Sequence, residues 1–144
     1  MADFPVNIAI RLFGSKVPTS LMPFSDISQV TVLLDADAED AEQAEEKVKQ
    51  FFASRGIQLT VVPVRAKKLI RVYRETQVLI SLVPNASWRL EYVVRRSRAR
   101  FKAGRVQLPE EPFDLVVSDP EGKSFPQTEV FERMTELMME LRTE

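Results

Sequence analysis

The sequence of 144 residues contains no cysteine and no histidine. Without cysteine, the chain has no disulfide framework, no thiolate nucleophile, and no cysteine-ligated zinc or iron–sulfur site. Without histidine, it lacks the most common general base, the serine–histidine–aspartate triad and the most common metal ligand. Any catalysis would therefore depend on carboxylates, lysine, tyrosine or a bound metal ion.

Glycine and long apolar runs are also scarce. The four glycines, at positions 14, 56, 104 and 122, are isolated, so the glycine-rich phosphate loops of Walker and dinucleotide-binding proteins are absent. No apolar run approaches the roughly 18–20 residues of a membrane span. The first residues, Met-Ala-Asp-Phe-Pro, lack the charged start and apolar stretch of a signal peptide. We therefore expect a cytoplasmic protein with no membrane span.

What the chain does contain predicts one α/β domain. Hydrophobic residues make up 44% and charged residues 28% of the sequence, as in ordinary globular proteins. Apolar runs predict strands over 30–34, 57–64, 78–83, 101–104 and 113–118. Helices are expected after the N-cap residues Asp37, Ser87 and Thr128, and Gly56 is expected as the C-cap of the first of them.

This alternation of strands and helices predicts a single-domain, three-layer, Rossmann-like sandwich. It has a mostly parallel sheet of about five strands and three main helices. We expect the domain to cover residues 30–144, after an irregular N-terminal arm over residues 1–29 in which 8–12 is a candidate edge strand. The basic stretch 65–76 has no clear pattern.

Charge is strongly segregated along the chain. Residues 1–64 carry a net charge of −4, residues 65–105 carry +10, and residues 106–144 carry −7, although the whole chain carries only −1. Such a distribution creates strong local fields. Either the basic segment meets an anionic partner, or the two acidic flanks fold back and neutralise it.

Seven basic side chains lie within the seventeen residues 89–105. They are the predicted anion-binding residues: Arg89, Arg95, Arg96, Arg98, Arg100, Lys102 and Arg105. Trp88 and Tyr92 are four residues apart, so they share a helix face and can stack on bases or sugars. Arginine suits phosphate because its planar fork binds two oxygens. The alternative interpretation is a solvated helix face paired with the acidic C-terminal segment, with Trp88 in the core.

A catalytic alternative depends on carboxylates at the ends of strands, where ligands bind in such folds. Asp35 and Asp37 follow the first strand in the pattern of haloacid-dehalogenase phosphatases, in which one aspartate attacks phosphorus, the next shuttles the proton and Mg²⁺ lies between carboxylates. Ser81, Lys102 and Asp119 would then supply the later motifs. A simpler interpretation makes Asp37 a helix N-cap and Asp119 the start of a turn.

The order of motifs resembles a family of small bacterial proteins of unknown function, typical of the Bacteroidetes group. The resemblance is carried by the strands 30–37, 78–83 and 113–117, the Phe-Phe-x-x-Arg-Gly run 51–56, the helix 88–99 and the Ala-Arg-Phe-Lys-Ala-Gly-Arg run 99–105. It extends from about residue 24 to the end of the sequence. Ser81 stands where members often have an acidic residue. The resemblance implies a fold and a cellular setting but no activity.

The Arg-x-Lys-x-Gly run 100–104 and the elements before it are also similar to the N-terminal domain of heptosyltransferase-like glycosyltransferases. Those enzymes need a second domain for the nucleotide sugar, and 144 residues leave no room for it. This resemblance therefore implies a lone domain that binds rather than catalyses.

The sequence thus favours a non-catalytic binding module without a cofactor, which presents its arginine-rich face to an anionic protein or nucleic acid. An Mg²⁺-dependent phosphatase-like hydrolase that uses Asp35 and Asp37 is the first alternative. Self-association through the oppositely charged faces, as a homodimer, is the second.

Overall fold

The computed structural model describes residues 7–10, 27–68, 70, 76–119 and 124–140. Predictions for the remainder of the N-terminal arm, for residues 71–75 and for the turn after Asp119 lie outside these residues. The elements occur in the order β1 (Asn7–Ile10), β2 (Gln29–Asp35), α1 (Ala41–Ala53), β3 (Gln58–Val64), β4 (Val78–Ser81), α2 (Trp88–Arg96), β5 (Phe101–Gly104), β6 (Leu115–Ser118) and α3 (Gln127–Glu140).

The strands form one sheet in the order β1-β6-β5-β4-β2-β3. Every neighbouring pair from β6 to β3 is parallel, and β1 pairs antiparallel with β6 at the edge. This confirms the predicted α/β fold with a mostly parallel sheet and three helices. Within the segment 1–29, β1 adds a sixth strand close to the expected edge strand.

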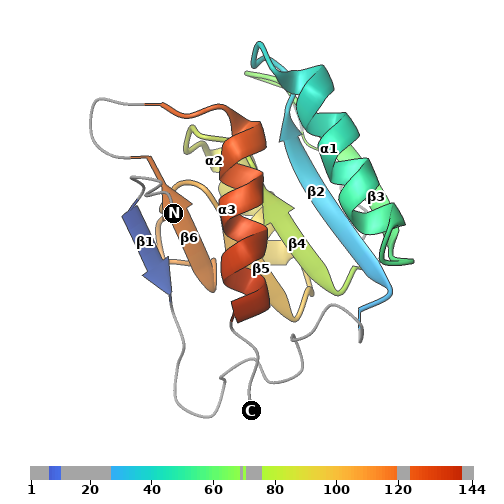
Figure 1. Cartoon of the computed structure of the whole chain (residues 1–144). Helices are drawn as coiled ribbons and strands as arrows, with labels where there is room; N and C mark the ends of the chain where they lie inside the picture. Colours follow the sequence, from blue (N-terminus) through green and yellow to red (C-terminus); the bar gives the residue numbers. More distant parts are fainter. Residues whose placement is uncertain (1–6, 11–26, 69, 71–75, 120–123, 141–144) are drawn as a thin grey trace.

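The helices form two layers, one on each face of the sheet (Figure 1). Alternate side chains of a strand point to opposite faces: Val32 and Leu34 belong to a core cluster with α1 and α3, whereas Leu33 belongs to a cluster with α2. Figure 1 shows α1 and α3 in front of the sheet and α2 behind it. The two acidic flanks of the sequence therefore supply helices to one face, and the basic segment supplies a helix to the other.

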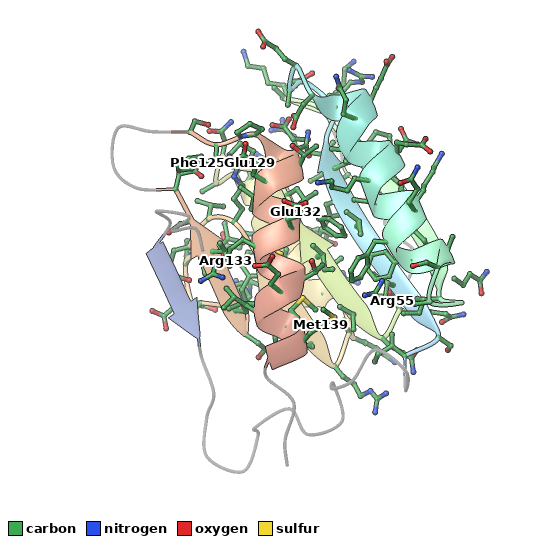
Figure 2. All side chains as sticks on the ribbon, viewed as in Figure 1. Arg55, Phe125, Glu129, Glu132, Arg133 and Met139 are labelled. Carbon is green, nitrogen blue, oxygen red and sulfur yellow. The ribbon has the colours of Figure 1, made fainter. Side chains whose placement is uncertain are left out.

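The first layer is held by aromatic and polar contacts. Phe51 and Phe52 of α1 meet Phe131 of α3 edge to face, with ring centroids 5.5 and 6.0 Å apart. At the end of α1, Arg55 donates from a guanidinium nitrogen to the sulfur of Met139 at 3.8 Å, and both are labelled in Figure 2. The two helices thus pack as one layer.

Within the described residues, no helix is both long and apolar enough to cross a membrane.

The predicted N-caps have different outcomes. Ser87 is confirmed, because its hydroxyl accepts the Leu90 N–H at 3.1 Å. The prediction that Asp37 is an N-cap is wrong, because two turns separate β2 from α1 and Asp40 is the N-cap residue. The prediction that Thr128 is an N-cap is also wrong, since Thr128 lies inside α3, which begins one residue earlier.

The ends of several elements also differ from the expected positions. The C-cap of α1 is Ser54, and Gly56 lies two residues beyond it with a left-handed φ of +69°. The strand expected over 113–118 begins at Leu115, and the strand expected over 78–83 ends at Ser81. Phe113 and Val83 are buried in loops instead, so their apolar character reflects packing rather than strand pairing.

Candidate anion-binding site

The outward side of α2 exposes two aromatic rings. Leu90 and Val94 turn one side of this helix into the core, which leaves Trp88 and Tyr92 on the opposite side because of the helical period. Trp88 is 62% and Tyr92 56% exposed, and they are the exposed large hydrophobic residues of the described part of the chain. The interpretation that places Trp88 in the core is therefore wrong.

Each of these rings has an arginine beside it. The guanidinium of Arg89 lies 4.7 Å from the Trp88 ring centroid, and that of Arg96 lies 5.1 Å from the Tyr92 ring centroid. Stacked guanidinium groups present a second flat, cationic surface next to the ring. We call the group Trp88, Arg89, Tyr92, Arg95, Arg96, Arg98 and Arg100 the α2 surface.

Few carboxylates neutralise the α2 surface. Arg95 pairs with Glu91 at 3.3 Å and with Glu110 at 2.9 Å. The other four arginines of the α2 surface form no ion pair with any carboxylate that the structure describes. The basic charge of the segment is thus largely unpaired within the described residues.

The acidic helices lie on the far side of the sheet. Together α1 and α3 carry seven glutamates against three basic residues, and Figure 2 shows Glu129 and Glu132 on α3, in the layer opposite α2. Glu132 forms its ion pair with Lys47 of α1, at 2.7 Å, within the same layer. Helix α3 therefore does not cover the basic helix, and within the described residues the expected pairing of this helix with the acidic C-terminal segment is limited to Glu110 on Arg95.

Two of the seven predicted basic residues do not belong to this surface. Lys102 is half-buried in β5, and its Nζ donates to the carbonyl of Val94 at 2.7 Å, near the C-terminus of α2. Burial lowers the pKa of Lys102, and the nearby Asp114 carboxylate opposes that effect. Lys102 therefore donates a hydrogen bond to a carbonyl near the C-terminus of α2 instead of facing an external anion.

Arg105 is buried, with a side chain only 3% exposed. Its guanidinium pairs with Asp119 at 2.9 Å and donates to the carbonyls of Leu82 and Phe125. The reason lies in the sheet: Arg105 directly follows β5, which runs between β4 and β6 in the interior. The prediction that Arg105 binds an external anion is therefore wrong.

A crevice opens at the carboxyl ends of β2, β3 and β4, next to the start of α2. Its volume is about 430 Å³, within the usual range for small-ligand pockets. Its charged lining residues are Asp35, Asp37, Arg65, Lys67, Lys68 and Arg89. The crevice and the α2 surface therefore meet at Arg89.

Of the predicted catalytic carboxylates, Asp35 and Asp37 line the same crevice, whereas Asp119 lies apart from them. Asp37 accepts the Ala66 N–H at 2.8 Å and lies 3.6 Å from Arg65. Asp119 is paired with the buried Arg105, on the other side of β4 and β5 from these groups. Among the described residues, no three acidic side chains come together as a metal site. The described carboxylates therefore do not form the Mg²⁺ centre of a haloacid-dehalogenase-like phosphatase.

Asp35 is held in place by Gln127, a residue that the sequence analysis did not identify. The Gln127 amide accepts the Asp35 N–H at 3.0 Å and donates to the Asp35 carbonyl at 2.8 Å. Asp40 accepts the Thr128 N–H at 3.1 Å, so the start of α1 caps the start of α3. A polar residue at the first turn of a helix gives no signal of a partner 92 residues away.

Burial raises the pKa of Asp35, and the charges of Asp37 and Asp40 add to this effect, while the Asp37 N–H and Arg105 oppose it. The folded state thus holds this proton more tightly than the unfolded chain, so the stabilisation exists at low pH and is lost as the pH rises through the folded-state pKa. At neutral pH the ionised Asp35 carboxylate therefore lowers the free energy of unfolding.

We therefore expect Asp35→Asn to raise the free energy of unfolding at neutral pH, because the asparagine oxygen can still accept the Asp37 N–H. The gain should shrink as the pH falls toward 3.8, the usual pKa of the group. Urea denaturation of both proteins at neutral and acidic pH measures this difference. A variant that is less stable at neutral pH would contradict the expectation.

Comparison of the chain with models of protein families, with curated proteins and with solved structures finds no match. The likeness to the bacterial family and to the glycosyltransferase domain accordingly stays a prediction from the sequence. A proposal about function therefore depends on the fold, the α2 surface and the crevice.

Proposed function

We propose that this protein is a non-catalytic binding module that holds a single-stranded nucleic acid on the α2 surface. The observation that carries the proposal is the pair of exposed rings, Trp88 and Tyr92, each with an arginine beside it. Aromatic rings that stack on bases, together with cationic groups that contact phosphates, are the usual components of single-strand binding sites.

The spacing of the two rings favours a single strand over a duplex. Trp88 and Tyr92 are four residues apart on α2, which is about 6 Å along the helix axis. Successive bases in a duplex are about 3.4 Å apart and have their faces covered by their neighbours. Bases that stack on both rings must therefore be unstacked from each other, which only a single strand permits at low cost.

The arginines fit the phosphates of such a strand. Arg96, Arg98 and Arg100 are exposed, follow one another closely, and pair with no described carboxylate. An acidic protein would also meet these charges, but it would leave two flat rings without a matching partner. We therefore prefer a nucleic acid to an acidic protein as the partner.

Binding of a short, fluorescently labelled RNA strand of mixed sequence, measured by anisotropy across a salt titration, tests the proposal. Tyr92→Ala should weaken binding by roughly 5–150-fold, the effect of losing one stacked base. Arg96→Glu should weaken binding and also reduce the dependence on salt, because fewer counterions are released. The same strand in duplex form should bind more weakly than the single strand.

Lys49→Glu is the matched control, because it makes the same charge change on α1, across the sheet, at a side chain that is 57% exposed. It should leave RNA binding nearly unchanged. Equal binding of a polyglutamate peptide, or an unchanged affinity in Tyr92→Ala, would contradict the proposal and indicate a protein partner. A dimer that forms at low salt and is lost with Arg96→Glu would indicate instead that the acidic layer of a second copy covers the α2 surface.

A further inference from the structure

The crevice beside the α2 surface lies where the order of the sheet reverses. The chain runs from β2 to β3 on one side, then returns past β2 to β4 on its other side. The loops that leave β2 and β4 therefore diverge and open a gap between the carboxyl ends of these two strands. In open α/β sheets this is the usual position of a ligand.

The lining of this crevice carries an excess of unpaired positive charge. Asp37 and Arg65 largely satisfy each other at 3.6 Å. Lys67, Lys68 and Arg89 line the same crevice and form no ion pair with any described carboxylate. Three cations that converge on one cavity without a partner favour an anionic ligand.

The backbone of Lys67 supports a ligand role for its loop. Its φ is +63°, in the left-handed region that residues other than glycine, asparagine and aspartate seldom adopt. Such backbone conformations are concentrated at ligand sites. Lys67 thus lines the crevice and has a backbone conformation that is unfavourable in free energy. This agrees with the cavity and its cations in indicating a ligand.

The size and the apolar part of the crevice indicate a ligand larger than inorganic phosphate. A volume of about 430 Å³ holds a small organic molecule. Val64, Ile70 and Val83 contribute apolar walls, which a sugar ring can contact but a lone phosphate cannot use. Arg89 lines the crevice and also lies 4.7 Å from the ring of Trp88, so the crevice and a base-stacking surface are one guanidinium apart.

We infer that this crevice binds a nucleoside monophosphate, with the phosphate held by Lys67, Lys68 and Arg89 and the base close to Trp88. Arg89 and Trp88 also belong to the α2 surface, but Lys67 and Lys68 lie outside it, so the crevice can be tested separately from the proposed binding of a nucleic acid strand. It adds a small-molecule site to a protein whose larger partner lies along α2.

Trp88 makes the test direct, because it is the one tryptophan of the sequence. Titration of the full chain with AMP should quench its fluorescence, and isothermal titration calorimetry gives the affinity independently. Adenosine should bind much more weakly, since it lacks the phosphate. Inorganic phosphate should compete with AMP, but only at higher concentration, because it lacks the contacts of the sugar and base.

The double variant Lys67→Asn/Lys68→Gln should weaken AMP binding by about tenfold or more, the effect of losing charge-assisted contacts. Asparagine is chosen at position 67 because it tolerates the left-handed backbone, so the melting temperature should stay close to that of the parent. Tyr92→Ala is the matched control: it should lose RNA binding and keep AMP binding. This pair of variants separates failure of the crevice from failure of the proposed function.

Four results would overturn the inference. The first is the absence of calorimetric AMP binding. The second is AMP binding that the double variant leaves unchanged. The third is equal affinity for AMP and for inorganic phosphate, which would show that the crevice selects a free phosphate and not a nucleotide. Equal affinity for AMP and adenosine would likewise remove the role given to the cations.

Discussion

Replacing Arg105 by alanine is expected to lower the free energy of unfolding by about 3–5 kcal/mol, the usual effect of breaking a buried ion pair. Its guanidinium holds Asp119 at 2.9 Å and also serves the carbonyls of Leu82 and Phe125. Alanine would leave a nearly buried carboxylate and two carbonyl oxygens without their donor. Urea denaturation followed by far-UV circular dichroism measures the change.

Variants of Asp119 provide the control for this prediction. Asp119→Asn in the Arg105→Ala background should recover part of the lost stability, because it removes the charge that the first substitution leaves unpaired. Arg105→Lys should lie between the parent and Arg105→Ala, since lysine keeps the charge but not the planar fork that serves several acceptors. A loss below about 1 kcal/mol in Arg105→Ala would show that the pair contributes no more than a surface ion pair.

Gly104→Ala is expected to destabilise the fold by about 1–3 kcal/mol or more, because the added methyl group overfills the core. A Cβ at this position would lie 2.3 Å from Cε2 and 2.4 Å from Cζ of Phe113. The Phe113 ring is 1% exposed and packs with Leu79 and Val116 in the core cluster beneath α2. Neither the ring nor the central strand β5 can move away cheaply. Thermal and urea denaturation measure the loss.

Phe113→Leu should partly rescue Gly104→Ala, since a smaller side chain makes room for the new methyl group. The double variant should therefore be more stable than the sum of the single effects predicts. Gly56→Ala is the matched control, because nothing lies within 4 Å of a Cβ there and its cost comes from a φ of +69°. Phe113→Leu should not rescue Gly56→Ala, and a rescue of both would contradict a steric cause.

The sequence predicted the elements of this fold well and their arrangement in part. Runs such as Val78–Ser81 are buried throughout, so their continuous apolar character marked them as central parallel strands. The order of strands in the sheet and the face that each helix covers depend on crossovers between distant segments. No local pattern contains that information, and the position of α2 across the sheet from α3 could be found only in the structure.

The candidate site was predicted less completely. The pattern of Leu90 and Val94 in α2 already placed Trp88 on the opposite side of the helix, so its exposure could have been derived from the sequence. The burial of Arg105 could not, because its partners come from Leu82, Asp119 and Phe125 in three other segments. In a run of arginines, nothing local distinguishes the one that lies inside.

The segregation of charge between the two layers of described helices creates an electric dipole across the sheet, positive on the side of α2. With a net charge of only −1, the field of a polyanion exerts little overall pull on the molecule but a substantial torque. An encounter with the nucleic acid proposed above would therefore begin with rotation, which would turn α2 toward the polymer before contact. Once bound, the protein would present α1 and α3 outward, and a second copy would meet a negative surface that limits coverage of the polymer to a single layer.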